Sequence, residues 1–594
     1  MKINKKITFW LLCSSLLSIA LGDQFGFAQE AENAKQAYKA AGGPRSPKVN
    51  VNWSRYYDHQ QTTGILQNLV AAYPNLARLE SVGKSVGGRD MWVITMTDFS
   101  AGTESRKPGF WIDGSIHANE IQATEVCTYT AWFLLEMHGE NEFVQKLLRD
   151  RVFYVAPMMS PDSRDEHFYA PNTTNSPRSG QRPLDDDKDG LIDEDKADDL
   201  DGDGHITQMR IKDPNGRFKP HPLYPELMIP IEVHEKGQYT LLGTEGLDND
   251  RDGRINEDGA GVYDPNRDWA WNWQPGYIQG GAHNYPFSIL ENRYIADFIK
   301  RHPNIAGAQT YHNTGGMLLR GPGSNQDTYE ASDLRVYDAI GKTGEKMLPG
   351  YRYLNVAKDL YEVWGGEVDW LHQMLGIYTF TNELFTQYNY FHQSQENRGG
   401  GRETTFEFNK LLLLGDGYVK WHEIEHPKYG KVEVGGAKKN WGRQPPGFML
   451  QEECHRNMAF TLYHADNMPQ VAIREITAKS IEKDLWEITT IVENTKLTPT
   501  HSAVDVLRKI TRPDHVTLSG NGLSVVMAEY SDDLLFRNST TQTDKPATVK
   551  LSSIAGSSIL YVRWIVAGAG GGKISVDSIK GGVAEASLEL KTAN

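Results

Sequence analysis

Two side chains that could hold a metal ion stand three residues apart in the segment WIDGSIHANE: His117 and Glu120. An apolar strand pattern, residues 110–112, precedes the pair, and a helix-like stretch follows it. Neutral imidazole and carboxylate are common ligands of a catalytic zinc ion, which takes three protein ligands and keeps one position for water. The pair predicts metal-dependent hydrolysis if the rest of the chain supplies a third ligand, a base and a substrate clamp.

The best candidate for the third ligand is His312. Residues 305–310 form an apolar run that predicts a buried strand, and His312 sits just past its end. Active sites of open α/β sheets gather at the carboxyl ends of the strands, where such a residue would lie. A buried structural histidine is the alternative interpretation.

Three further motifs accompany His312 along the chain. Asp-Pro-Asn-Arg-Asp-Trp precedes it at 264–269, and Tyr-Glu-Val-Trp-Gly-Gly-Glu-Val-Asp-Trp follows it at 361–370. Glu383 ends the next predicted strand, fourteen residues after Asp369. With the His-x-x-Glu pair, and in this order, these motifs resemble those of the zinc metallocarboxypeptidases of the carboxypeptidase A/B/T type. The resemblance covers roughly Tyr56 to Asp466.

The resemblance implies a metal centre and a base. His117, Glu120 and His312 would hold the zinc ion, which lowers the pKa of its bound water and polarises the scissile carbonyl. Glu383 would be the general base that takes the proton of the water and passes it to the leaving amine.

The resemblance also implies a substrate clamp. Asn266 and Arg267 would bind the terminal carboxylate of a peptide, and Tyr361 would close over it on a mobile loop. An additional arginine should stabilise the tetrahedral oxyanion. Arg178 is the nearest counterpart, and Arg182 is the alternative.

Two positions depart from the family pattern. Asn119 stands where digestive members carry an arginine between the His and Glu ligands, so substrate contacts there must differ. Val368 stands where the enzymes specific for basic residues carry an aspartate. A preference for C-terminal Lys or Arg is therefore less expected.

Strand-like and helix-like segments alternate around the opening motif. Strands are expected at 76–82, 91–96, 109–113 and 152–156, and helices at 62–73 and 124–137. This alternation predicts an α/β fold with a mixed, mostly parallel sheet and helices on both faces, as in carboxypeptidases.

The chain divides into three predicted parts. Residues 1–29 have the charged start and apolar run of a secretory signal peptide, which predicts a secreted or periplasmic protein. Residues 44–468 would form the catalytic domain. Residues 469–594 would form a β-sandwich accessory domain, because β-rich segments at 485–492, 516–526 and 559–566 alternate with polar turns.

An acidic insertion, residues 183–260, interrupts the catalytic pattern. It carries the motif Asp-x-Asp-x-Asp-Gly three times, with the carboxylates of Asp185, Asp187, Asp189, Asp199, Asp201, Asp203, Asp248, Asp250 and Asp252. Alternate carboxylates before a glycine turn suit Ca²⁺, although the twelfth position lacks the glutamate of a standard EF-hand. The hypothesis is structural calcium; a solvated acidic loop is the alternative.

A second zinc motif, His-Glu-x-x-His, occurs at 422–426. That chemistry needs both histidines on one face of a helix. Pro427 follows His426 directly and pushes it out of the helical region, so a helix should end under the motif. The motif is not expected to bind zinc.

Composition narrows the partners. The 594-residue chain has a formal net charge of −15, which disfavours nucleic acid and anionic membranes, and no stretch after the leader could span a bilayer. Only Cys127 and Cys454 follow the leader, and whether they pair is open.

Three functions are consistent with these residues. The leading one is a zinc carboxypeptidase acting on peptides with a free C-terminus. The second is a hydrolase of cell-wall peptides from the same family. The third is a calcium-dependent binding or adhesion protein with a relic catalytic domain.

Overall fold

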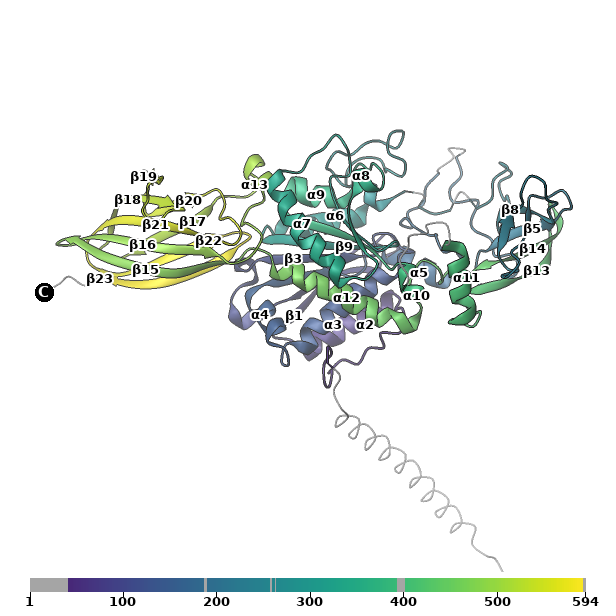
Figure 1. The fold of residues 1–594 in the computed structure, drawn as a ribbon, viewed down its shortest axis with the longest axis horizontal. Coiled ribbons are helices and arrows are strands. Elements are labelled where there is room, and N and C mark those ends of the chain that lie inside the picture. Colours follow the sequence, from purple (N-terminus) through teal and green to yellow (C-terminus); the bar gives the residue numbers. More distant parts are fainter. Residues whose placement is uncertain (1–40, 186–189, 257–258, 262, 393–400, 591–594) are drawn as a thin grey trace, which may run out of the picture.

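The computed structural model describes residues 41–185, 190–256, 259–261, 263–392 and 401–590. The predicted signal peptide, Asp187 and Asp189 lie outside these residues. Three parts follow one another along the molecule (Figure 1): a β-sandwich, a central α/β body, and a small antiparallel sheet at the opposite end.

The central body contains an eight-stranded sheet in the order β1-β2-β4-β3-β9-β12-β10-β11. Its strands are β1 (Ala77–Lys84), β2 (Asp90–Met96), β3 (Gly109–Gly114), β4 (Val152–Ala156), β9 (Ile305–Asn313), β10 (Met317–Arg320), β11 (Arg352–Asn355) and β12 (Tyr378–Leu384). The four middle strands, β4, β3, β9 and β12, pair in parallel, and antiparallel pairs flank them. The predicted mixed sheet is confirmed.

Helices cover both faces of this sheet because its strands are apolar on both sides. In β3, Phe110 and Ile112 join one hydrophobic cluster, and Trp111 between them joins another. The first cluster includes side chains of α2 (His59–Ala72), α3 (Gln122–Met137), α4 (Glu142–Asp150), α7 (Ala331–Met347) and α12 (Gly447–Asp466). The second includes α6 (Leu290–Arg301) and α9 (Glu367–Leu375). Four short helices complete the body: α5 (Pro161–Tyr169), α8 (Val356–Asp359), α10 (Tyr388–Phe391) and α11 (Gly401–Leu411).

A six-stranded antiparallel sheet, which the sequence did not predict, occupies the end opposite the sandwich (Figure 1). Its order is β13-β14-β5-β8-β6-β7, with β5 (Gln208–Lys212), β6 (Phe218–Pro220), β7 (Met228–Pro230), β8 (Tyr239–Thr244), β13 (Tyr418–His426) and β14 (Gly430–Ala437). The acidic insertion thus pairs with a distant hairpin.

The His-Glu-x-x-His motif lies on β13 rather than on a helix. His422 is exposed, with Nε2 3.0 Å from a carboxylate oxygen of Asp201. His426 is buried, with Nε2 3.2 Å from the carbonyl of Gly246. A helical zinc site is therefore absent at this motif.

Two antiparallel sheets between Val471 and Leu590 pack around a shared core. One contains β15 (Val471–Glu482), β16 (Leu485–Asn494), β18 (Ser524–Ser531), β19 (Thr540–Gln542) and β21 (Ser558–Ala567); the other contains β17 (Asp514–Gly520), β20 (Thr548–Leu551), β22 (Gly570–Ser578) and β23 (Gly582–Leu590). Residues 516–526, expected as one β segment, belong to two strands in different sheets, because Asn521 and Gly522 form a turn.

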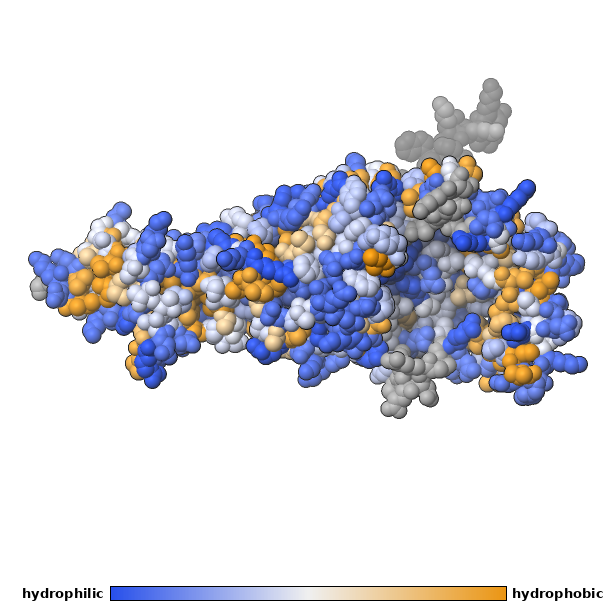
Figure 2. Space-filling model, turned by 90° about the horizontal axis from the view of Figure 1, so that it is seen from above, coloured by the Kyte–Doolittle hydropathy of each residue, from blue (hydrophilic) through white to orange (hydrophobic). Residues whose placement is uncertain are grey.

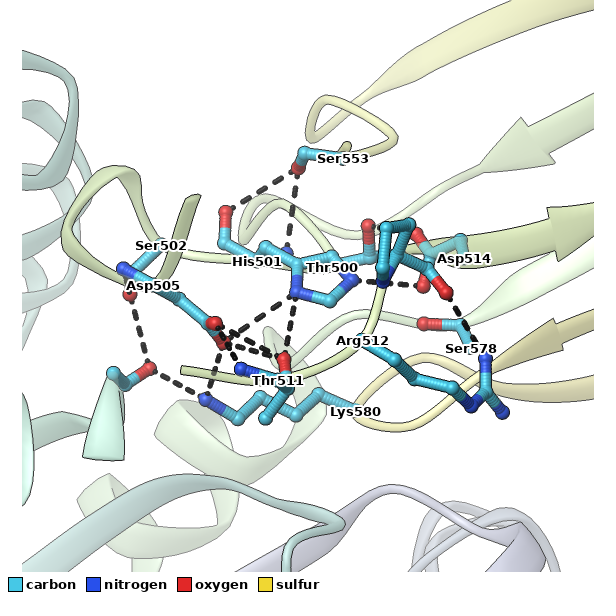
Figure 3. Close-up of polar contacts among 12 residues, drawn as sticks. Thr500, His501, Ser502, Asp505, Thr511, Arg512, Asp514, Ser553, Ser578 and Lys580 are labelled. Atoms are coloured by element: carbon cyan, nitrogen blue, oxygen red, sulfur yellow. Dashed lines mark hydrogen bonds and ion pairs between the residues drawn. The ribbon is translucent and has the colours of Figure 1, made fainter. Parts of the chain in front are cut away.

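A buried polar cluster joins the sandwich to the α/β body (Figure 3). Lys580 Nζ donates to the carbonyls of Leu375 and Gly376, at the end of α9, and to Asp505 on the short helix α13 (Ala503–Arg508). His501 Nε2 lies 2.9 Å from Asp514 and its Nδ1 3.4 Å from Asp505. These contacts fix the sandwich against the helix that precedes β12.

The molecular surface is mainly hydrophilic on the face shown in Figure 2, with hydrophobic residues in separate groups. Across the described ranges, no helix has the length and apolar character needed to cross a membrane. Cys127 and Cys454 are both buried and unpaired with each other.

Candidate metal centre

Three predicted ligands meet at the carboxyl ends of β3 and β9. His117 and Glu120 lie in the turn between β3 and α3, and Ser115 opens that turn with a φ of 54°. His117 Nδ1 lies 3.0 Å from Glu120 Oε1, and His312 Nδ1 lies 3.0 Å from Oε2. The two imidazole Nδ1 atoms are 3.1 Å apart. All three side chains are buried.

These residues fit a zinc ion. One ligand atom from each of the three lies within 4.8 Å of the others, and two imidazoles with one carboxylate form a known catalytic zinc set. Burial raises the pKa of Glu120, but His117 and His312 outweigh this effect and hold it well below its ordinary value. The carboxylate is therefore ionised, as a metal ligand must be.

Glu383 is the direct neighbour of His312 across the parallel strands β12 and β9. Each residue lies within its strand and not past the strand end. Strand β12 continues from Glu383 to Leu384, and β9 continues from His312 to Asn313. Burial, and next the charge of Glu120, raise the pKa of Glu383 to about 7. A carboxylate with this environment is suited to accept and return a proton near neutral pH.

Asp264 contacts the first predicted ligand, His117, a contact that was not predicted from the sequence. Its Oδ1 lies 2.9 Å from His117 Nε2, the ring nitrogen that faces away from Glu120. Metal-bound histidines usually give this second nitrogen to a carboxylate. Burial raises the pKa of Asp264, but His117 and Arg267 lower it more. The sequence did offer one signal for this contact: Asp264 stands two residues before Asn266, in the same motif.

Arg178, rather than Arg182, approaches the triad. Arg178 Nη1 donates to Glu120 Oε1 at 2.9 Å. Its backbone carbonyl accepts from Ala118, which attaches the Arg178 loop to the ligand loop. Arg182 offers its backbone N–H to the hydroxyl of Tyr263 instead.

The predicted clamp residues share one cavity with two of the three predicted ligands, His117 and His312. Asn266, Arg267 and Tyr361 line it together with Arg178 and Glu383. Its remaining walls include five apolar side chains, Leu319, Val356, Leu360, Val363 and Val368. Tyr361 is 57% exposed, whereas Arg267 is buried and its Nε has no partner among the described residues.

Arg443 also reaches the triad, and no sequence motif pointed to it. It lies between β14 and α12, and its Nη2 is 3.1 Å from Glu120 Oε1. Asn119, between the ligands, is buried and its side-chain amide has no partner among the described residues.

The acidic motifs lie apart from the triad, in the insertion. The carboxylates of Asp199, Asp201 and Asp203 form one group, and those of Asp248, Asp250 and Asp252 another. Asp185 is described, but the other two aspartates of its motif are not. Backbone N–H groups donate to Asp199 from three residues, Gly202, Asp203 and Gly204.

Several segments of this chain are similar in sequence to known proteins. Residues 62–182 and 239–403 match the zinc carboxypeptidase family, and residues 470–589 match a domain of unknown function. A zinc carboxypeptidase of Saccharothrix mutabilis subsp. capreolus is 30% identical over 131 residues, which are 22% of this chain and 30% of that protein. Carboxypeptidase B of Astacus astacus is 24% identical over 383 residues, 61% of this chain and 97% of that protein.

Among solved structures, thrombin activatable fibrinolysis inhibitor aligns with a TM-score of 0.44 and 16% identity over 71% of this chain and 76% of that one. Carboxypeptidase A of Helicoverpa armigera aligns with a TM-score of 0.38 and 16% identity over 61% and 72%. The family match spans both ligand motifs, the Asn-Arg pair and Glu383. The chain belongs to the zinc carboxypeptidase family.

Proposed function

We propose that this protein is a zinc-dependent carboxypeptidase that removes C-terminal residues from peptides. The carrying observation is the cavity in which His117, His312 and Glu383 face the pair Asn266 and Arg267, with Glu120 in contact with both histidines. An endopeptidase would not need a buried guanidinium beside the metal ligands, whereas a terminal carboxylate does.

Each group has one task in this proposal. A bound zinc ion would supply a Lewis acid and an acidified water. Glu383 takes a proton from the attacking water and returns it to the leaving amine. Arg178 donates to the oxyanion once its N–H is no longer engaged by Glu120.

The clamp selects the substrate end. Arg267 donates Nη1 to the carbonyl of Asn266 at 2.8 Å and lines the cavity beside the metal ligands. Tyr361, exposed at the rim, closes over the bound carboxylate. The apolar wall at Val363 and Val368 favours an apolar terminal side chain.

The Glu383→Gln variant tests the mechanism. Loss of the base should lower kcat by roughly 10²–10⁴-fold while zinc content stays at the parental level. Activity would be read by mass spectrometry of a peptide library, with Glu345→Gln, an exposed site on α7, as control. Parental rates in Glu383→Gln would contradict the proposal.

The same digest separates the substrate classes. Muropeptides, assayed beside linear peptides, test the alternative of a cell-wall peptide hydrolase, since their stem peptides also end in a carboxylate. Binding without turnover of either substrate would favour the relic adhesion protein instead.

We also infer that the acidic groups of the insertion bind structural Ca²⁺. Six aspartates converge in two groups, and among the described residues the basic side chains that contact them are His422 at Asp201, Lys428 at Asp248 and Arg254 at Asp252. Oxygen-rich groups of this kind suit a hard cation. EGTA at constant zinc should lower the thermal midpoint by several degrees, read by calorimetry; an unchanged midpoint would reject calcium.

Export is part of the proposal. The charged start and apolar run of residues 1–29 support removal of a signal peptide. Mass spectrometry of the secreted chain should give an N-terminus near residue 30.

A further inference from the structure

Arg443 enters the metal centre from outside the part of the chain that matches the family. The family match ends at residue 403, and Arg443 follows the β13–β14 hairpin. Its side chain is 18% exposed and makes three contacts through its two Nη atoms. Nη2 donates to the carbonyl of Asn313 at 2.7 Å and to Glu120 Oε1 at 3.1 Å, and Nη1 donates to Asn175 at 2.8 Å.

Three side-chain nitrogen atoms crowd Glu120 Oε1. His117 Nδ1, Arg178 Nη1 and Arg443 Nη2 all lie within 3.1 Å of this one oxygen. A carboxylate oxygen has two lone pairs, so it cannot accept from both guanidinium groups and also bind a metal ion. A divalent cation at the triad also repels both guanidinium groups. With zinc bound, each arginine therefore has an N–H group available at the edge of the metal centre.

The position of Arg443 identifies which part of a peptide it would meet. The clamp cavity, with Asn266 and Arg267, takes the C-terminal end. A second open cavity, of ≈ 720 Å³, is lined by Asn175 and by the loop before the acidic insertion. Arg178 lines both cavities, so they meet beside the triad. A peptide held by its C-terminus would pass Arg178 and continue toward Asn175 and Arg443.

We propose that Arg443 binds the substrate, through the backbone carbonyl that lies one residue to the amino-terminal side of the scissile bond. Asn175 holds the guanidinium by Nη1 and directs Nη2, while the Asn313 carbonyl keeps its plane in place. Its Nε, buried and without a partner among the described residues, is a further donor. This inference rests on the proposed carboxypeptidase function and adds a residue contributed by the segment between β14 and α12.

Two ligands separate this role from a merely structural one. N-butanoyl-phenylalanine has no carbonyl beyond the scissile bond, whereas N-acetyl-alanyl-phenylalanine has one. Their affinities for the zinc-loaded protein would be measured by calorimetry in the Glu383→Gln background, where turnover cannot interfere. Arg443→Gln and Arg443→Lys would be compared with Arg456→Gln, which removes an exposed arginine on α12.

Arg443→Gln should weaken binding of the acetyl-alanyl ligand by about tenfold to a hundredfold and leave the butanoyl ligand within about twofold, because only the first offers the carbonyl. Arg443→Lys should recover part of the lost affinity. The control variant Arg456→Gln should bind both ligands as tightly as the parent. Zinc affinity, measured by chelator competition, should be unchanged or higher, since a positive charge near the metal is removed.

Equal losses for both ligands, or a fall in zinc affinity that parallels them, would show that Arg443 only positions Glu120 and would overturn the proposal. Failure of the proposed function gives a different result. In that case the parent cleaves neither ligand, while the affinities in the Glu383→Gln background still report whether Arg443 senses the second carbonyl.

Discussion

At the scale of single residues, the metal centre is a balance of buried charges. Three carboxylates, Glu120, Asp264 and Glu383, lie among three guanidinium groups, Arg178, Arg267 and Arg443. Isolated buried charges are costly, and pairing offsets the cost. Arg178 and Arg443 fulfil that role for Glu120.

Asp264→Asn tests the orienting carboxylate. The substitution keeps the side-chain shape but weakens the partner of His117 Nε2, so zinc affinity should fall by about 10- to 100-fold. Competition with a chromogenic chelator measures it. Asp297→Asn, an exposed position on α6, is the control and should keep the parental affinity. If Asp264→Asn also binds zinc as tightly as the parent, Asp264 does not tune the ligand.

Local motifs allowed prediction of some site residues but not of others. His117 and Glu120 are three residues apart, and Asn266 is adjacent to Arg267, so their chemistry is visible in sequence. Arg443 is over 300 residues from Glu120 and belongs to no motif, so only the folded chain brings it there. Asn119 marked the place where substrate contacts should differ, and Arg443 contacts the next residue along the chain.

At the scale of elements, α9 links the proposed substrate clamp to the sandwich. At its start, the N–H of Glu367 donates to Asn266 Oδ1, and the carbonyl of Gly365 accepts from Trp269. At its end, Lys580 binds the carbonyls of Leu375 and Gly376. These carbonyls are orphan acceptors of a helix terminus, and a lysine there also complements the helix dipole.

Lys580→Met should destabilise the fold by at most about 3–5 kcal/mol, because two buried carbonyls and Asp505 lose this cation while Asp505 keeps His501 as a partner. Urea unfolding followed by tryptophan fluorescence measures this loss. Lys573→Met removes an exposed ion pair with Glu585 on the neighbouring strand and should cost less than about 1 kcal/mol. Equal midpoints for the two variants would show that the buried lysine contributes no more than the surface one.

Elements with strong periodicity could be predicted from sequence, and elements defined by distant pairing could not. The strands β2, β3 and β4 and helix α3 lie within two residues of their expected ranges. The six-stranded sheet combines short strands of the insertion with β13 and β14, about 200 residues away, and β6 and β7 have three residues each. Such pairing leaves no local pattern. For the same reason, no motif revealed that His312 and Glu383 would be register partners.

At the scale of the whole molecule, the junction between sandwich and α/β body is electrostatic and buried. His501 lies between Asp505 and Asp514, and Asp505 also receives Lys580 (Figure 3). Asp333, on α7, accepts the N–H groups of Ala503 and Val504. The two parts therefore meet through charges whose state depends on pH.

This junction predicts a specific pH dependence of stability. Burial lowers the pKa of His501, but Asp505 and Asp514 outweigh burial and raise it to about 9. Because the folded pKa lies above the ordinary value of 6.5, the stabilisation is fully present below about pH 6.5 and is lost as the pH rises through about 9. The loss amounts to at most about 3 kcal/mol.

Urea unfolding of the parent at pH 6 and at pH 10 gives the difference between the free energies of unfolding at these two pH values. The His501→Gln variant should show a smaller difference, because the substitution lowers stability mainly at pH 6. His234→Gln, an exposed position in the insertion, should leave the difference unchanged. Other groups titrate in the same range, so the comparison between variants carries the argument rather than the parental curve alone. If His501→Gln reproduces the parental difference between the two pH values, the imidazole at the junction is not charged in the folded protein, and the sandwich is held there by its remaining hydrogen bonds.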